Sequence, residues 1–197
     1  MDSLAARLAQ ASPTAVDGVW QRHVAAKYTD TALAGRRSMG RWGTEDGSPV
    51  LYLGRPTESV IVEAYRHLVD PIAEPDGRVP PIRPRVLVTC DISVSEILDL
   101  RLAVHRILAD LSIEQLQSET HDRAAYAACQ TVAAAAHQVG YHGIVAPAAT
   151  KMSHTLVLFT ELLPYGELPV RTKQETWFEL LADPRKPGGG GRLRVAR

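Results

Sequence analysis

Two arginines, a tyrosine and a glutamate in the first part of the chain combine the groups that are needed to hold and cleave a charged nucleotide. Arg41 lies in a glycine-flanked Arg-Trp pair, Tyr52 in the short apolar run that follows, and Glu63 in the next apolar run. Arg22 lies earlier, in another run of strand-forming residues. A guanidinium binds phosphate oxygens in pairs, and a carboxylate stabilises developing positive charge. We therefore base the functional interpretation on these four residues.

Residues 19–25 are expected to form the strand that positions Arg22. They are rich in strand-forming side chains and alternate loosely between apolar and polar types. If Trp20 and Val24 face inward, Arg22 shares their face, because side chains repeat every two residues along a strand. An arginine on an apolar face requires an anionic partner. The alternative is an edge strand with imperfect alternation and Arg22 in water, and the sequence leaves both open.

Residues 26–48 are expected to form the long loop that carries Arg41. They contain four glycines and little periodic apolar content. Loops of this length are uncommon in compact domains and are often functional. Arg36, Arg37 and Arg41 give the loop positive charge. A strand at residues 50–54 follows the loop and holds Tyr52.

Glu63 lies in a segment whose secondary structure the sequence leaves open. The Pro-Thr-Glu sequence at residues 56–58 resembles a helix start, with Thr57 as the N-cap. A helix would bury one apolar stripe and place Glu63 on the other side, near Arg66 and His67, as a solvated carboxylate. The run is also rich in β-branched residues, which favour a strand. The helical period by itself favours the solvated carboxylate.

The rest of the chain predicts alternating helices and strands in one domain. The most distinct helix spans residues 124–139, because it is alanine-rich and Gly140 follows at the position where helices commonly end. Residues 71–84 contain five prolines and are expected to form a surface connection or an inserted loop. Further helices are expected at residues 3–11, 102–111 and from Ser112, with strands at 85–92, 97–100, 142–147 and 155–160, and a strand or short helix at 170–178.

Composition restricts the chain to a globular protein without excess charge. Its 197 residues suit one domain, and 45% hydrophobic residues suffice for a core. Lys+Arg and Asp+Glu both number 22, so we do not expect this chain alone to bind nucleic acid. Cys90 and Cys129 are expected to be buried, reduced thiols. The sequence has no signal-peptide pattern and no apolar run of membrane-spanning length, which favours a cytoplasmic protein.

Several common catalytic signatures are missing from the sequence. It has no His-Glu-x-x-His or Cys-x-x-Cys pattern, no Walker loop, no Gly-x-Gly-x-x-Gly after a strand and no Gly-x-Ser-x-Gly elbow. No metal is therefore expected. Classical NTPases, dehydrogenases and serine hydrolases are disfavoured as well.

Six short motifs occur in order over residues 19–165. They are Trp20-Gln21-Arg22-His23, residues 36–42, Leu51-Tyr52-Leu53, Val62-Glu63-Ala64, Ala128-Cys129-Gln130 and residues 143–148. Each motif is short, and their order and spacing together resemble the RES-domain family, the toxins of RES–Xre toxin–antitoxin pairs. The resemblance implies a mixed α+β fold with an ADP-ribosyltransferase-like sheet.

The resemblance also implies an activity, namely degradation of NAD+ by hydrolysis or phosphorolysis of the nicotinamide–ribose bond. Glu63 would hold the ribose hydroxyl and stabilise the oxocarbenium-like ion, with Arg22 as the second catalytic residue. Arg22 and Arg41 would hold the pyrophosphate, because a guanidinium binds two oxygens at once. Tyr52 and His23 would complete the substrate site. NAD+ would then be the substrate, with phosphate as a co-substrate if cleavage is phosphorolytic.

The implied organisation is an N-terminal extension at residues 1–18, a RES-like catalytic domain at 19–182 and a flexible Gly/Arg-rich tail at 183–197. The implied partner is an Xre-type helix-turn-helix antitoxin, and the implied assembly is a homodimer or a hetero-oligomer with that antitoxin. No membrane partner is expected.

Two family residues have no counterpart here. The family serine falls at Ala127 in some members and at Ala148 in others, and neither position carries a hydroxyl. The family asparagine after Arg-Trp is replaced by Gly43. Two alternatives therefore stay open: an ADP-ribosyltransferase that modifies a macromolecule, and a catalytically weakened RES protein that acts by binding a partner.

Overall fold

Five strands pair into a closed ring in the computed structural model, which describes residues 2–71, 82–186 and 193–194. In order of pairing, the ring comprises β1 (Thr14–Ala25), β2 (Val50–Arg55), β5 (His154–Phe159), β4 (Gly143–Pro147) and β3 (Arg85–Asp99). The long β3 pairs with β1 as well as with β4, and this closes the ring. The β3–β4 pair is parallel, whereas β1–β2, β1–β3, β2–β5 and β4–β5 are antiparallel. A further strand, β6 (Val170–Trp177), pairs with β3 outside the ring.

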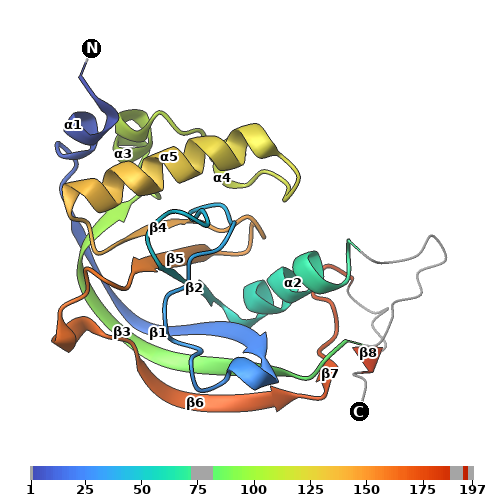
Figure 1. Cartoon of the computed structure of the whole chain (residues 1–197). Coiled ribbons are helices and arrows are strands. Elements are labelled where there is room, and N and C mark those ends of the chain that lie inside the picture. Colours follow the sequence, from blue (N-terminus) through green and yellow to red (C-terminus); the bar gives the residue numbers. More distant parts are fainter. Residues whose placement is uncertain (1, 72–81, 187–192, 195–197) are drawn as a thin grey trace.

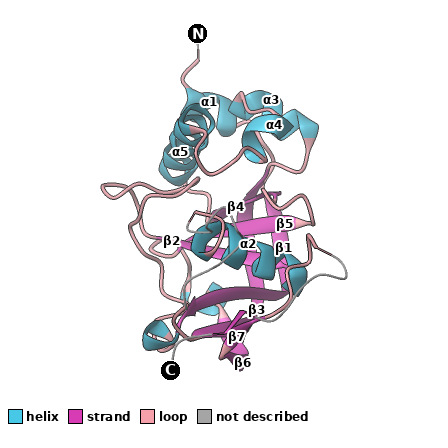
Figure 2. Ribbon diagram, turned by 90° about the vertical axis from the view of Figure 1, so that its right-hand side faces the viewer, coloured by secondary structure: helices cyan, strands magenta, loops and turns pink. Residues whose placement is uncertain are grey.

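The helices form two groups. In two perpendicular views, α1 (Leu4–Leu8), α3 (Ala103–Ala109), α4 (Ile113–Leu116) and α5 (Arg123–Val139) gather at one end, and α2 (Thr57–Leu68) lies apart from them (Figure 1 and Figure 2). Short 3-10 helices lie at Ala26–Tyr28 and Tyr165–Glu167, and the two-residue strands β7 (Glu179–Leu180) and β8 (Leu193–Arg194) pair with each other. The described residues contain no helix that is both long and apolar enough to cross a membrane.

Apolar side chains fill the ring. Trp20 and Val16 point inward from β1, as the two-residue period of a strand requires. All five strands contribute to the filling, which consists of Val16, Trp20, Leu51, Leu53, Cys90, Ile92, Val94, Ile97, Val145, Leu156 and Leu158. This core holds the strands that carry the candidate site residues in a fixed register.

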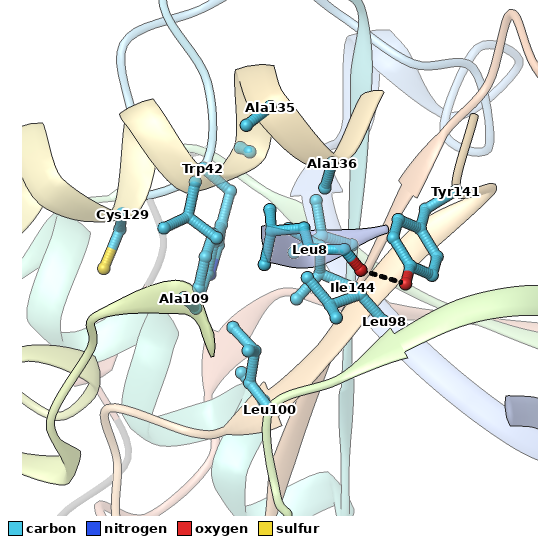
Figure 3. Close-up of a cluster of buried hydrophobic side chains, with 14 of the residues drawn as sticks. Leu8, Trp42, Leu98, Leu100, Ala109, Cys129, Ala135, Ala136, Tyr141 and Ile144 are labelled. Carbon is cyan, nitrogen blue, oxygen red and sulfur yellow. Dashed lines mark hydrogen bonds between the residues drawn. The ribbon is translucent and has the colours of Figure 1, made fainter. Parts of the chain in front are cut away.

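A second core lies between α5 and the sheet. Trp42, from the long loop after β1, is 3% exposed and packs in this cluster with Leu8, Leu98 and Leu100 (Figure 3). The Tyr141 hydroxyl donates to the backbone carbonyl of Leu8 at 2.8 Å and thereby ties α1 to the end of α5. The alanines of α5 allow this close packing because their side chains are small.

The apolar stripe of α2 forms a third core. Val60, Ile61, Ala64 and Tyr65 pack with residues of β3, β6 and β7. The segment around Glu63 is therefore a helix, and the strand alternative is wrong. Tertiary burial of these residues outweighs the strand preference of their β-branched side chains.

The predicted N-cap of this helix is also wrong. Pro56 occupies the cap position and makes no side-chain cap bond. The Thr57 hydroxyl instead donates to the side-chain carbonyl of Gln21 on β1, at 2.8 Å. A long-range partner has therefore replaced the local one that the sequence suggested.

Residues 85–92 and 97–100, predicted as two strands, belong to the single strand β3, apart from Leu100. Glu96 has a φ of 52° inside this strand, and the register with β1 shifts between Thr14 and Val16 opposite it. One extra residue of β3 is accommodated there, as in a β-bulge. A bulge interrupts the apolar alternation without ending the strand, which is why the pattern predicted a break.

Most other predicted elements are confirmed within a few residues. α5 ends at Gly140, which has a φ of 99°, and Ser112 caps α4 through a complete capping box. Residues 170–177 form a strand. Most of the proline-rich connection (72–81) and most of the C-terminal tail (187–192 and 195–197) lie outside the described residues.

The predicted single-domain mixed α+β fold is confirmed by the single interconnected set of strands and helices. Cys90 and Cys129 are free and buried, as predicted. No observation tests the division into an extension, a catalytic domain and a tail, so this division stays a prediction.

We predict that Gly140→Ala lowers the free energy of unfolding by about 1 kcal/mol, because alanine is strained at positive φ. A Cβ at this position would meet no atom within 4 Å, so steric contact adds nothing. The measurement is urea unfolding of both proteins.

The matched control is Gly166→Ala. A Cβ there would also meet nothing within 4 Å, and Gly166 lacks a positive φ. Equal changes in the two variants would contradict the strain explanation.

Candidate active site

One cavity of about 900 Å³ collects all five candidate residues that the sequence predicted. Arg22, His23, Arg41, Tyr52 and Glu63 all line it. They come from β1, the long loop, β2 and α2, and residues of α4 and α5 line it as well. The structure therefore brings the predicted residues together, while their individual roles stay predictions.

Arg22 is a half-buried cation in this cavity. Burial lowers the pKa of its guanidinium to about 10, and the positive charges of Arg36 and Arg85 add to the shift. In the part of the chain that the structure describes, Arg22 forms no hydrogen bond or ion pair. Because β1 pairs with both β2 and β3, the edge-strand alternative is wrong.

His23 is held neutral beside Arg22. Its Nδ1 lies 3.2 Å from Nε and 2.9 Å from Nη2 of Arg85. A guanidinium only donates, so Nδ1 accepts and the ring proton lies on Nε2. Burial first, and then the charges of Arg85, His67 and Arg22, lower the pKa of His23 well below 6.5. The ring also stacks on Trp177 with the planes 14° apart.

Glu63 reaches the cavity from the middle of α2. Its Oε2 lies 3.2 Å from Nε2 of His67, one helical turn later, and its side chain is 32% exposed. The helical period correctly places Glu63 opposite the apolar stripe. That side of the helix faces the cavity, however, so the carboxylate is not simply a bulk-solvated surface group.

Arg41 lines the cavity and also holds its wall together. It is 8% exposed. Its Nη1 donates to the Gln115 carbonyl at 2.7 Å and to the Ser118 hydroxyl at 2.9 Å, and its Nη2 donates to the Ser118 carbonyl at 2.6 Å. The guanidinium also stacks over the ring of Tyr126. These contacts use three of the roughly five N–H donors of an arginine and give Arg41 a structural role beside its predicted role in binding substrate.

Tyr52 shapes the loop that carries Arg41. Its hydroxyl accepts a hydrogen bond from the Trp42 backbone N–H at 2.9 Å, and burial raises its pKa. A Cβ on Gly40 would lie 2.7 Å from that hydroxyl, so only glycine fits there without a shift. The Gln130 side chain donates to the carbonyls of Gly40 at 2.8 Å and Gly43 at 3.2 Å. Tyr52 on β2 and Gln130 on α5 thus both hold the turn by hydrogen bonds to its backbone.

The cavity is strongly positive in its charge balance. Of the described residues that line it, Glu63 alone carries a carboxylate, against the four arginines Arg22, Arg41, Arg66 and Arg123. Arg66 is paired with Glu119 at 3.3 Å. An uneven set of this kind suits a ligand with several negative charges.

Ser59, Arg66 and Arg123 line the cavity but were not predicted as site residues. Ser59 and Arg66 lie four residues before and three residues after Glu63, the spacings at which helical side chains share a face. Assuming a helix and taking Glu63 as the centre would have found both. Arg123 comes from α5, and no local pattern connects it to α2.

The two alanines at the family serine positions do not line the cavity. Ala127 is exposed on α5, and Ala148 is buried after β4. The next residue, Ala149, does line it. The hydroxyl that the family serine would supply at either position is therefore not missing from the described lining of the cavity.

Comparisons with known proteins identify the family and the fold of the chain. A family model described as RES domain matches residues 19–180. A chain of the M. tuberculosis MbcT–MbcA toxin–antitoxin complex superposes with a TM-score of 0.70 at 21% sequence identity, covering 88% of this chain and 91% of that chain. At this identity the likeness shows a shared fold. No curated protein matches the sequence significantly.

We predict that Gly40→Ala destabilises the protein less in a Tyr52→Phe background than in the wild type. The added methyl would collide with the Tyr52 hydroxyl, and phenylalanine removes that oxygen. The coupling energy should exceed about 0.5 kcal/mol in a double-mutant cycle of urea unfolding. Additive changes would show that the hydroxyl does not restrict residue 40.

We further predict that His23 makes the protein less stable as the pH falls below about 6.5. Its pKa is lower in the folded than in the unfolded state, so the unfolded state binds the extra proton in this range. The loss approaches about 1.4 kcal/mol per pH unit between the two pKa values.

His23→Asn should remove this component, since its side-chain oxygen can still accept from Arg85 without titrating. Urea unfolding between pH 7 and pH 5 measures the effect, and the exposed His121→Asn is the control. The same pH slope in His23→Asn and in the wild type would refute the assignment.

Proposed function

Since the chain belongs to the RES domain family, we propose that it is the toxin of a toxin–antitoxin pair and consumes NAD+ by cleaving the nicotinamide–ribose bond. One observation carries the proposal. Among the residues that the structure describes, the half-buried Arg22 has no hydrogen-bond or ion-pair partner, and it shares a cavity with one carboxylate, that of Glu63. The first suits the pyrophosphate of a dinucleotide, and the second suits the positive charge that bond cleavage creates on the ribose.

Glu63 is the one carboxylate among the described residues that line the cavity, and a single carboxylate suits this reaction. Glycosidases commonly need a second carboxyl group, which protonates the leaving oxygen or activates water. Nicotinamide leaves NAD+ as a neutral molecule and needs no general acid. In our proposal, Glu63 holds a ribose hydroxyl and stabilises the oxocarbenium-like ion as the bond to nicotinamide breaks.

The arginines account for the rest of the substrate. No described residue pairs with Arg22 as an anion, so the pyrophosphate would supply the missing negative charge. Arg123, from α5, also lines the cavity and adds a second positive charge. Tyr52 and His23 line the same space, and in our proposal their rings contact nicotinamide or adenine. Water or phosphate would complete the reaction as acceptor.

An inhibitory partner belongs to this proposal, because unrestrained loss of NAD+ in the cytoplasm would damage the producing cell. The superposed M. tuberculosis chain comes from a toxin–antitoxin complex. We propose an Xre-type helix-turn-helix antitoxin that covers the cavity. An inhibitor of this kind would compete with NAD+ and stabilise the fold by mass action.

We predict that Glu63→Gln lowers the rate of NAD+ consumption by about a hundredfold or more while leaving the fold intact, because the transition state loses its counter-charge. Purified protein is incubated with NAD+ and the products are separated by chromatography. Glu58→Gln is the matched control, since Glu58 is an exposed carboxylate on the same helix and does not line the cavity.

The products decide between the alternatives. Free nicotinamide with ADP-ribose or its phosphate supports the proposal, whereas label transferred to protein or nucleic acid supports an ADP-ribosyltransferase. Wild-type turnover in Glu63→Gln would refute the role of Glu63. Absence of turnover in the wild type, with antitoxin binding intact, would support a RES protein that acts by binding.

A further inference from the structure

Ser59 presents a buried hydroxyl to the cavity one helical turn before Glu63. It is 2% exposed and lines the cavity, and its Oγ lies 2.7 Å from Oγ1 of Thr150. We propose that Ser59 donates a hydrogen bond to the ribose diol that Glu63 also holds, and that Thr150 is the positioning residue that orients Ser59. This inference rests on the proposed function only in requiring a ribosyl ligand.

The hydrogen bonds around Thr150 are compatible with donation from Thr150 to Ser59. The Met152 backbone N–H points to Oγ1 of Thr150 at 3.4 Å and can only donate. A hydroxyl that accepts from Met152 can still donate to Ser59 or accept from it, because it has one proton and two lone pairs. In our proposal Thr150 donates its own proton to Ser59. Each donation strengthens the next along such a chain.

This direction leaves the Ser59 proton free. Within residues 2–71, 82–186 and 193–194, Thr150 is the only side-chain partner recorded for the Ser59 hydroxyl. A buried donor without an acceptor is unfavourable, and a ligand oxygen in the cavity would satisfy it. Ser59 therefore acts as a donor toward the bound molecule.

The spacing of Ser59 and Glu63 fits a pair of neighbouring hydroxyls. Residues four apart on a helix share a face, with their Cβ atoms about 5–6 Å apart. Glu63 as a carboxylate only accepts, and Ser59 in this arrangement donates. One ligand hydroxyl can donate to Glu63 while its neighbour accepts from Ser59, which is the pattern that a vicinal diol such as that of ribose satisfies.

Ser59, oriented by Thr150, also supplies a hydroxyl to the cavity of a chain that lacks the family serine. Ala148 is buried and does not line the cavity, and Thr150 follows it by two residues in the same loop. The loop after β4 therefore contributes its hydroxyl indirectly, through α2.

Titration calorimetry with ADP-ribose tests the proposal, since this probe keeps the ribose diol and has no nicotinamide bond to cleave. Ser59→Ala should weaken binding about three- to tenfold, the value of one neutral hydrogen bond. Ser153→Ala is the matched control. Ser153 lies in the loop after β4 that also carries Thr150, its hydroxyl is near His154, and it does not line the cavity. Thermal unfolding verifies that both variants are folded.

Thr150 is tested by rescue. Thr150→Val keeps the shape and removes the hydroxyl, so binding should weaken, whereas Thr150→Ser should restore most of it. ADP-ribose analogues that lack one hydroxyl of the terminal ribose identify the contact. With the analogue that lacks the hydroxyl bound by Ser59, Ser59→Ala should lower the binding affinity no further.

The outcomes separate this inference from the proposed function. Three outcomes would each overturn the inference. The first is equal ADP-ribose affinity of Ser59→Ala and Ser153→Ala, and the second is an effect of Ser59→Ala that is the same for every analogue as for ADP-ribose. The third is no binding of ADP-ribose by the wild type. The expected binding pattern in a wild-type protein that leaves NAD+ intact would overturn the proposed function alone.

Discussion

The turn from Gly40 to Gly43 is the constraint on which the cavity depends. Gln130 donates to the carbonyls of Gly40 and Gly43, and the Tyr52 hydroxyl accepts from the backbone of Trp42 between them. The Trp42 side chain is thereby placed in the core under α5, and the Arg41 side chain is placed against residues 115–118. One short turn therefore joins the loop to β2, α4 and α5, and each of these contributes to the cavity wall. Loss of the clamp would free the long loop rather than a single side chain.

The buried positive charges near the site are unfavourable for the stability of the fold. Burial and two neighbouring arginines lower the pKa of Arg22, which means that the fold holds this cation in an unfavourable environment. Burial also lowers the pKa of Arg85, to about 10, and its guanidinium is turned to the neutral His23. A protein selected only for stability would place a carboxylate beside them. Groups with shifted pKa values cluster at functional sites, and Arg22 and His23 both line the cavity.

Local patterns predicted the elements well and the contacts between them poorly. The helical period of α5 and the glycine after it were sufficient to place that helix, and the motif order brought Arg22 and Glu63 to notice. No pattern could show that Arg41 binds residues 74 and 77 positions away, or that Thr57 prefers Gln21 to its own helix end. These partners are far apart in the sequence and lie side by side only in the folded chain. The neutral composition also concealed the positive cavity, because the compensating acids lie elsewhere.

The position of Glu63 is determined by residues of α2 that have no proposed role in the reaction. One side of α2 is fixed by Val60, Ala64 and Tyr65, which pack against the sheet. The Tyr65 hydroxyl donates to the Leu181 carbonyl, and Arg185 pairs with Asp70 at 2.7 Å just after the helix. The helix therefore cannot rotate without breaking its core, and the opposite face must present its polar groups to the cavity. Among the described residues the carboxylate of Glu63 contacts His67, and the packing of α2 fixes the direction from which it enters the cavity.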